Sequence, residues 1–277
     1  MPEGPEIKRA ADEIAEAIAG REVKEIFFAF AHLKRFEAQF TGQVVSTVEP
    51  RGKALLIRFP YGWNIYSHNQ LYGKWIIRNA FDFPETNRQL RLAIHNHQKS
   101  ALLYSASAIE VLHDGELAAH PFLSRLGPDV LDPKTTLPDV IQRFTDKRFA
   151  GKKLTTLLLD QGFLAGLGNY LRSEILFAAG VHPSKRPRDC TEAEIEKLAK
   201  AALELSRQSY QTGGITNDLA RVKTLKSAGW QRRDYRFQVF NRENRPCFQC
   251  GTAITREMHG SRRLYFCPTC QASRYLR

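Results

Sequence analysis

Four cysteines near the end of the chain constrain its fold more than any other feature. They form two pairs, Cys247-x2-Cys250 and Cys267-x2-Cys270, and sixteen residues separate the pairs. Two such pairs joined by a hairpin place four thiolates in a tetrahedron, which is the arrangement of a closed structural zinc site. Because no ligand position remains open in such a site, we expect one structural Zn²⁺ and a small module whose folding depends on it.

The cysteine distribution also indicates a compartment. Four of the five cysteines lie within the last 31 residues, which favours a metal site in a reducing compartment over a disulfide framework. The remaining cysteine, Cys190, is then expected to be a free thiol. No secretory signal, twin-arginine run or long apolar span is visible, so we expect a soluble intracellular protein without a membrane partner.

The charge balance favours a polyanionic partner. Lys and Arg number 41 against 29 Asp and Glu, for a net charge of +12, and neutralisation of phosphate dominates nonspecific nucleic-acid affinity. The hairpin between the cysteine pairs carries Arg256, Arg262 and Arg263, which could grip phosphate bidentately. On composition alone, arginines that merely keep an exposed ribbon soluble explain the pattern equally well.

The first part of the chain predicts one helix followed by strands. Apolar residues recur at helical spacing from Ile7 to Ile18, and Gly20 follows as a C-cap. The strand patterns then run, between turn residues, over Val23–Phe30, Val44–Val48, Ala54–Phe59, Trp63–Ser67, Lys74–Arg78, Gln89–His95 and Ala101–Tyr104. Short strands with tight turns favour an antiparallel sandwich or barrel. We interpret His95 and His97 as solvated or edge residues rather than metal ligands.

The second part of the chain is predominantly helical. Turn residues concentrate between Gly127 and Pro138, so we place the domain boundary there and expect three parts, 1–132, 133–236 and 237–277. Helices are predicted at Pro138–Phe144, Leu154–Asp160 and Tyr170–Ala179, and from a Thr191–Glu194 capping box to Ser209. Segment 213–236 is basic and lacks clear periodicity, which predicts a loop.

Two short stretches could bind phosphate. Gly162 to Asn169 contains three glycines ahead of a helix, and such a turn exposes backbone N–H groups at the positive end of the helix. A compact turn between packed helices explains it as well. Lys53, in Arg51-Gly52-Lys53, is by itself most simply a surface lysine.

The N-terminus, Met1-Pro2-Glu3-Gly4-Pro5-Glu6, offers a reactive amine. If Met1 is removed, Pro2 becomes a secondary amine beside a carboxylate. The pKa of an α-amino group is about 7.7–8, against about 10.4 for a lysine side chain. Roughly a tenth of the terminal amine is therefore unprotonated at neutral pH. Such an amine can attack an aldehyde-like carbon while Glu3 moves protons. The alternative is a stiff leader that caps a helix.

Five of these motifs, in this order, resemble the bifunctional DNA glycosylases of the formamidopyrimidine-DNA glycosylase/endonuclease VIII family. They are Pro2-Glu3-Gly4-Pro5-Glu6, Arg51-Gly52-Lys53, Ser67-His-Asn-Gln-Leu-Tyr-Gly73, Gly166-Leu-Gly-Asn-Tyr170 and the four-cysteine finger. The resemblance covers essentially the whole chain. Gly4, Gln70-Leu71-Tyr72 and Leu103-Tyr-Ser-Ala-Ser107 are more similar to endonuclease VIII than to the oxidised-purine branch.

The resemblance implies an α+β fold of two domains. An N-terminal helix and an antiparallel β-sandwich form the catalytic domain, and a helical domain follows with a helix-two-turn-helix motif and a β-hairpin zinc finger. It also implies damaged double-stranded DNA as the partner, held between the domains, a monomer, and the bacterial cytosol and nucleoid as location.

The resemblance assigns roles to single residues. Pro2 would attack C1′ of the damaged nucleotide, Glu3 would assist ring opening, and Lys53 would support β-elimination. Arg262, or the adjacent Arg263, would bind phosphate and serve δ-elimination. The DNA-binding residues would be Gln70, Leu71 and Tyr72, which fill the space left by the everted base, together with Arg125 and Asn169. Glu6 and Glu174 match acidic positions that line the family's active site.

The implied function is base excision repair, with a preference for oxidised pyrimidines. Two alternatives stay open: an oxidised-purine glycosylase of the same family, and a noncatalytic zinc-ribbon DNA-binding protein. The segment 213–236 and the tail 271–277 depart from the bacterial pattern. Met1, if retained, would leave no free proline amine.

Overall fold

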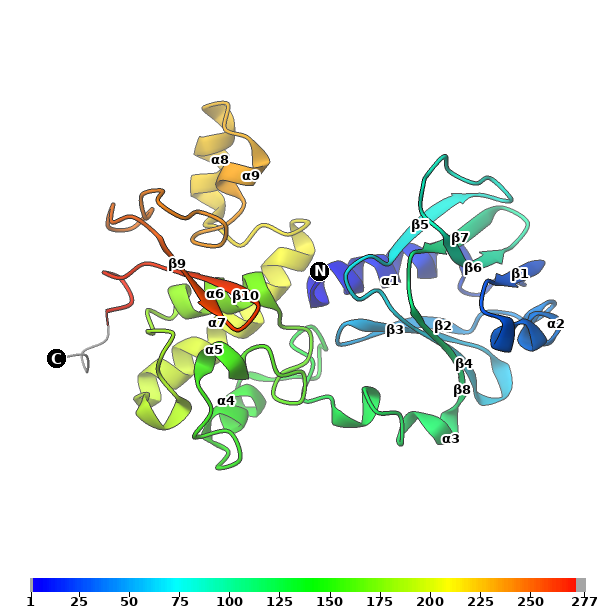
Figure 1. The fold of residues 1–277 in the computed structure, drawn as a ribbon, viewed down its shortest axis with the longest axis horizontal. Helices are drawn as coiled ribbons and strands as arrows, with labels where there is room; N and C mark the ends of the chain where they lie inside the picture. Colours follow the sequence, from blue (N-terminus) through cyan, green and yellow to red (C-terminus); the bar gives the residue numbers. More distant parts are fainter. Residues whose placement is uncertain (1, 273–277) are drawn as a thin grey trace. The chain divides into compact units, whose positions relative to one another are not determined.

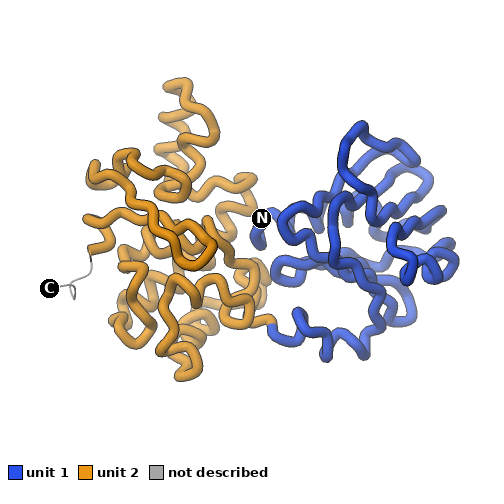
Figure 2. The backbone as a smooth tube through the Cα atoms, viewed as in Figure 1, with its two compact units in different colours: residues 1–125 blue, residues 126–277 orange. Residues whose placement is uncertain are grey.

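The chain divides into two compact units. The computed structural model describes residues 2–272, and the units are residues 1–125 and 126–277 (Figure 2). The first combines a helix with antiparallel sheets, and the second is helical with a terminal hairpin, so the expected two-domain α+β fold is confirmed. The expected division into three parts stays a prediction, and Met1 and the tail after residue 272 lie outside the described residues.

The first unit pairs its longest helix with two sheets (Figure 1). Helix α1 (Gly4–Ile18) buries Ile7, Ile14 and Ile18 on one face, as the apolar spacing predicts. Gly20 follows with a φ of +70°, a left-handed conformation that glycine adopts without steric cost and that ends many helices.

The two four-stranded sheets are antiparallel, with strand orders β1-β6-β7-β5 and β2-β3-β4-β8. Their bounds are β1 Glu25–Phe28, β2 Thr47–Arg51, β3 Ala54–Arg58, β4 Trp63–His68, β5 Lys74–Asn79, β6 Leu90–His95, β7 Lys99–Tyr104 and β8 Ala108–His113. One core joins them to the helix, because Leu55 and Ile57 of β3 and Leu103 of β7 pack in the same cluster as Ile14. The predicted sandwich is therefore present, with the start of α1 carried on this core.

The interpretation of His95 as a solvated residue was wrong. Its side chain is only 1% exposed, its Nδ1 lies 2.6 Å from Ser100 Oγ, and the ring of Phe81 stacks on it with centroids 4.6 Å apart. Strand β6 ends at His95, so His97 lies in the following turn, where it is exposed. A neighbouring hydroxyl and an aromatic ring make burial of a neutral imidazole favourable, and both come from residues outside β6.

The second unit is a helical core with a short hairpin. Its helices are α4 Leu137–Thr145, α5 Leu154–Leu157, α6 Asn169–Ala178, α7 Glu192–Gln211, α8 Leu219–Ser227 and α9 Arg232–Tyr235, and its strands are β9 Thr255–His259 and β10 Arg262–Phe266. The predicted capping box is confirmed: Thr191 N donates to Glu194 Oε2 at 2.9 Å, and Glu194 N donates to Thr191 Oγ1 at 3.2 Å. Among residues 2–272, no helix is both long and apolar enough to cross a membrane.

The prediction of a loop over residues 213–236 was wrong, because the segment folds into α8 and α9. Asp218 caps α8 by accepting a hydrogen bond from Arg221 N at 2.7 Å. Val222 packs with Ile215 and Tyr235 in a small separate core. Such a short helix has too few apolar positions for a clear period, and its tertiary partners come from either side of it in the sequence.

Candidate active site and metal centre

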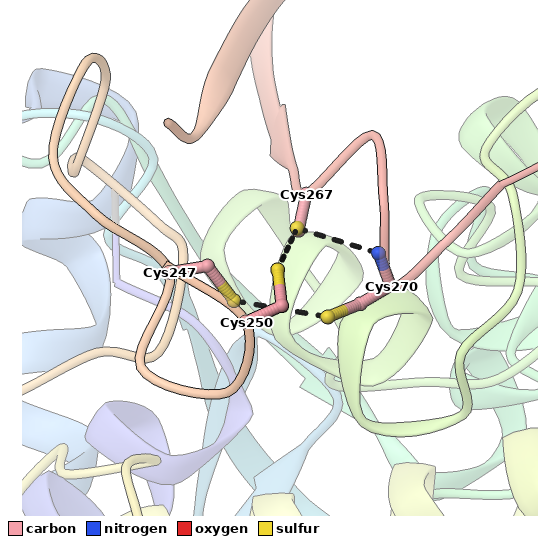
Figure 3. Close-up of side chains that lie close together, drawn as sticks. All are labelled: Cys247, Cys250, Cys267 and Cys270. Atoms are coloured by element: carbon pink, nitrogen blue, oxygen red, sulfur yellow. Dashed lines mark hydrogen bonds between the residues drawn. The ribbon is translucent and has the colours of Figure 1, made fainter. Parts of the chain in front are cut away.

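The four predicted cysteine ligands converge at the base of the β9–β10 hairpin (Figure 3). All four sulfur atoms lie within 4.8 Å of one another; Cys247 and Cys270 are separated by 3.8 Å and Cys250 and Cys267 by 3.4 Å, Sγ to Sγ. A tetrahedral ion with bonds of about 2.3 Å needs sulfur separations of about 3.8 Å. Backbone N–H groups of Gln249 and Cys270 point at Cys247 Sγ and Cys267 Sγ, both at 3.4 Å. The cluster therefore fits a metal ion.

Cys190 is separate from this cluster, as expected. It is half-buried, its Sγ donates to Arg186 O at 3.4 Å, and burial raises the pKa of its thiol to about 11. A thiol with so high a pKa carries little thiolate at neutral pH and is a poor nucleophile.

Pro2 and Glu3 stand at the positive end of α1. Glu3 is the N-cap of the helix and is only 3% exposed, while Pro2 is half-buried. Glu3 N donates to Glu6 Oε2 at 3.0 Å, so Glu6 serves the cap. The helix dipole favours a carboxylate and disfavours a protonated amine at this end, which suits an amine that must be neutral to react.

Lys53 is buried, contrary to its interpretation as a surface lysine from its local sequence. It is 6% exposed and occupies the two-residue turn between β2 and β3, where Arg51 pairs with Ala54 and Gly52 has a φ of +61°. The pKa of His68 is lowered, first by burial and second by the positive charge of Lys53. The Lys53 side chain is therefore buried, with its positive charge close enough to His68 to act on that ring.

Gln70, Leu71 and Tyr72 form the exposed turn between β4 and β5. Leu71 is 54% and Tyr72 68% exposed, which is a costly way to present an apolar and an aromatic side chain unless they meet a ligand. The backbone at Gln70 has a φ of +48°, and Gln70 N donates to His68 Nδ1 at 2.9 Å.

Neighbouring loops support this turn. Ser107 Oγ donates to Gln70 Oε1 at 2.6 Å, and Arg88 Nη1 donates to Tyr72 O at 2.6 Å. Gly73 has no room for a side chain, because a Cβ there would lie 2.6 Å from the Asn69 backbone. Arg125, also expected to bind DNA, is exposed in a single turn of 3-10 helix that ends the first unit.

In the second unit, Asn169 meets the finger hairpin. It is the first residue of α6 and is half-buried, and its Nδ2 donates to Arg263 O at 2.9 Å. Arg262 and Arg263 begin β10 and their side chains are exposed. The structure thus brings Asn169 together with the arginine pair, whereas Pro2, Glu3, Lys53 and Gln70–Tyr72 all belong to the first unit.

Glu174 lies in the interior of the second unit. It is fully buried and accepts hydrogen bonds from the backbone N–H groups of Gln238, Val239 and Phe240 at 2.8 to 2.9 Å and from Thr216 Oγ1 at 2.6 Å. One carboxylate therefore anchors both ends of the segment that carries α8 and α9.

Sequence reasoning assigned no role to three supporting residues, Arg88, Ser107 and Arg172. Ser107 had a signal, since it closes the motif Leu103-Tyr-Ser-Ala-Ser107. Arg172 had one too, because it lies next to Ser173 and Glu174, with apolar residues on either side, in Tyr170-Leu-Arg-Ser-Glu-Ile-Leu176. Charges in a mainly apolar helix predict a buried polar network.

Comparison with known proteins identifies both units. The formamidopyrimidine-DNA glycosylase N-terminal domain matches residues 1–106, and the H2TH domain of the same enzymes matches residues 126–220. Endonuclease 8 of Salmonella schwarzengrund and that of Salmonella paratyphi B are each 45% identical over 271 residues, covering 98% of this chain and 100% of the relative.

Solved structures show the same fold. Lactococcus lactis formamidopyrimidine-DNA glycosylase, bound to DNA with an AP site, matches with a TM-score of 0.80 and 21% identity over 98% of this chain and 100% of that chain. Its complex with DNA containing FAPY-dG gives a TM-score of 0.80 and 20% identity over 97% and 99%. With both domain models matched and close relatives aligned over nearly its full length, this chain belongs to the formamidopyrimidine-DNA glycosylase/endonuclease VIII family.

Proposed function

We propose that this DNA glycosylase with AP-lyase activity, an enzyme of base excision repair, excises oxidised pyrimidines through a Schiff base on Pro2. It then cleaves the strand by β,δ-elimination. The observation that carries the mechanism is the placement of Pro2 and a buried Glu3 at the N-terminus of α1. The preference for pyrimidines rests on the 45% identity to proteins named Endonuclease 8.

The chemistry begins when the neutral Pro2 amine attacks C1′ of the damaged nucleotide. The C1′–N bond to proline forms, the glycosidic bond breaks, and the base leaves with a proton. Glu3 protonates the ring oxygen as the sugar opens, which gives an iminium ion at C1′. Loss of a C2′ proton then expels the 3′ phosphate, and a second elimination expels the 5′ phosphate. No water attacks phosphorus in these steps.

The remaining site residues hold the DNA. Lys53 supports β-elimination through the sugar or its phosphate, and Arg262, beside Arg263, binds phosphate and serves δ-elimination. Gln70, Leu71 and Tyr72 enter the duplex, where stacking offsets part of the cost of everting the base. Asn169 and Arg125 bind backbone phosphate. A monomer acting on chromosomal DNA in the bacterial cytosol is sufficient for this chemistry.

The metal in the finger is proposed to be Zn²⁺. Four thiolates at the observed sulfur separations match its tetrahedral preference and leave no ligand position for substrate. Its role is to fold the module that carries Arg262, so the excision chemistry does not involve it.

Parallel excision assays test the substrate. With duplexes that contain thymine glycol or 8-oxoguanine opposite cytosine, we expect faster release of the pyrimidine lesion. Faster release of 8-oxoguanine would instead favour the oxidised-purine alternative.

A second experiment tests the alternative of a noncatalytic zinc-ribbon DNA-binding protein. The variant Pro2→Gly removes the secondary amine but leaves the DNA-binding residues in place. We expect it to lose strand cleavage while duplex affinity stays nearly unchanged. Equal cleavage by wild type and variant would show that another group or a contaminant acts.

A further inference from the structure

Helix α6 carries a buried cation. Arg172 is only 1% exposed, in the helical core where Leu171 and Ile175 are fully buried. Removing a guanidinium from water is costly unless its N–H groups find acceptors. The groups that accept hydrogen bonds from Arg172 therefore indicate which parts of the second unit it holds together.

Within residues 2–272, Arg172 donates to acceptors in three parts of the second unit. Nη1 donates to Thr155 O of α5 at 2.9 Å, and Nη2 donates to Asn169 Oδ1 at 2.7 Å and to Arg263 O of β10 at 3.0 Å. Asn169 Nδ2 donates to the same Arg263 carbonyl at 2.9 Å. The side chains of Arg172 and Asn169 and the finger backbone thus form a closed triangle of hydrogen bonds.

This triangle fixes which way the Asn169 amide faces. Its oxygen is committed to the guanidinium and one N–H to the carbonyl, which leaves the second N–H for an outside acceptor. Without Arg172, the amide could rotate by half a turn and present its oxygen to an incoming phosphate, which would repel it. One buried arginine therefore sets the polarity of a proposed DNA contact.

The same contact fixes the finger strand. Arg263 O is held by Arg172 and Asn169, and two residues later Tyr265 N donates to Ser173 Oγ at 3.3 Å. Leu264, between them, is fully buried in the core that contains Leu171. The start of β10, with the exposed side chains of Arg262 and Arg263, is therefore held against α6 as drawn in Figure 1.

From these contacts we propose that Arg172 is a positioning residue that makes Asn169 and the Arg262–Arg263 pair one rigid phosphate-binding unit. The inference rests on the proposed function, because it assigns phosphate to Asn169 and Arg262. Arg172 itself does not touch DNA. It acts through the Asn169 amide and the Arg263 carbonyl.

The test uses Arg172→Met, which retains length and loses the donors, in the full-length metal-loaded protein. Affinity for a duplex with a tetrahydrofuran abasic-site analogue is measured as a function of salt. We expect binding to weaken about tenfold and the slope of log K against log salt to fall by about one phosphate contact. Borohydride trapping at saturating DNA should stay within about twofold of wild type, because Pro2 and Glu3 belong to the other unit.

Lys185→Met is the matched control. Lys185 is also a largely buried cation of the second unit, but its Nζ donates to Glu194 Oε1 and Oε2 at 2.7 and 2.9 Å, away from the finger. The variant should lower thermal stability and leave the salt slope unchanged. If Arg172→Met and Lys185→Met give the same slope, Arg172 is only a structural residue and the inference is wrong.

A double-mutant cycle gives the second readout. Because Arg172 acts partly through Asn169, the loss of affinity on combining Arg172→Met with Asn169→Ala should be smaller than the product of the two single losses. Losses that multiply would overturn the inference. Arg172→Lys decides the matter if Arg172→Met does not fold, because lysine keeps the charge but not the fork of donors. We expect Arg172→Lys to reduce the salt slope by less than one phosphate contact. A salt slope equal to that of wild type would contradict the inference.

The two levels of interpretation fail differently. If wild type neither binds the abasic-site duplex nor forms a trapped adduct on damaged DNA, the proposed function is wrong. If wild type does both and only the Arg172 results deviate from expectation, the positioning role alone is wrong.

Discussion

Glu3 shows how much at this site depends on a single side chain. Its carboxylate is buried at the N-cap of α1, next to the proposed nucleophile. The roles of Pro2 and Glu3 could be predicted from the sequence, because the two residues are adjacent. In addition, any terminal amine has a lower pKa than a lysine side chain, whatever the fold. Burial of Glu3 could not be predicted, since it depends on tertiary packing around the start of the helix.

Replacing Glu3 by Gln removes the acid and keeps the shape. We expect base excision to slow by about 10² to 10⁴, the usual contribution of a positioned acid, while affinity for damaged duplex changes little. Single-turnover excision assays measure this. Glu13→Gln on the exposed face of the same helix is the control and should excise at the wild-type rate; a matching loss in both variants would contradict the role of Glu3.

His95 predicts a pH dependence of stability. Burial lowers the pKa of His95 below its ordinary value of 6.5, so the unfolded chain binds more protons than the folded one as pH falls through 6.5. Stability therefore decreases from pH 7.5 to pH 5.5. Burial lowers the pKa of His68 and His182 in the same direction.

The contribution of His95 is separable by substitution. We expect His95→Gln to be less stable than wild type at pH 7.5 and to lose less stability on going to pH 5.5. Urea midpoints at the two pH values measure both quantities. An equal or greater loss in the variant would show that His95 does not titrate in the folded protein as its burial implies.

Among the elements, the finger was the easiest to predict and α8 the hardest. Cysteine spacing fixes a metal knuckle locally, so Cys247 and Cys250 identify it without tertiary information. The attachment of the finger to α6 could not be predicted, because Arg172 and the carbonyl it binds are 91 residues apart. Similarly, α8 is stabilised by the contact of Val222 with Tyr235 and by the cap at Asp218, and neither forms a periodic pattern.

Removal of the metal should act on this element first. Without the ion, the four cysteine ligands lose the metal that joins them. Small thiolate modules of this kind fold only with the metal bound. We expect chelation to abolish binding to damaged duplex and to leave the sandwich, which has its own core, folded by circular dichroism.

Zn²⁺ is expected to restore binding, and elemental analysis should find one zinc per chain. Retention of full duplex affinity by metal-free protein would show that the finger does not need the ion. Cys190→Ser serves as the control, because Cys190 lies apart from the cluster and its loss should not alter metal content.

On the scale of the whole molecule, the proposed catalytic and phosphate-binding residues are distributed over two units. The first carries Pro2, Glu3, Lys53 and the Gln70–Tyr72 turn, and the second carries Asn169 and the finger. The net charge of +12 attracts the phosphate backbone of DNA to both units. Fold class and family could be predicted from motif order, whereas the internal ties of each unit depend on long-range contacts that no local pattern encodes.

The central claim is that the proline amine is the nucleophile, and one measurement tests it directly. Protein whose N-terminal mass shows loss of Met1 is incubated with thymine-glycol duplex and borohydride, and the adduct is digested and mapped by mass spectrometry. We predict a reduced DNA–protein bond at the Pro2 nitrogen, and no bond at Pro2 in protein that retains Met1. An adduct at Lys53, or no adduct with correctly processed protein, would contradict the mechanism.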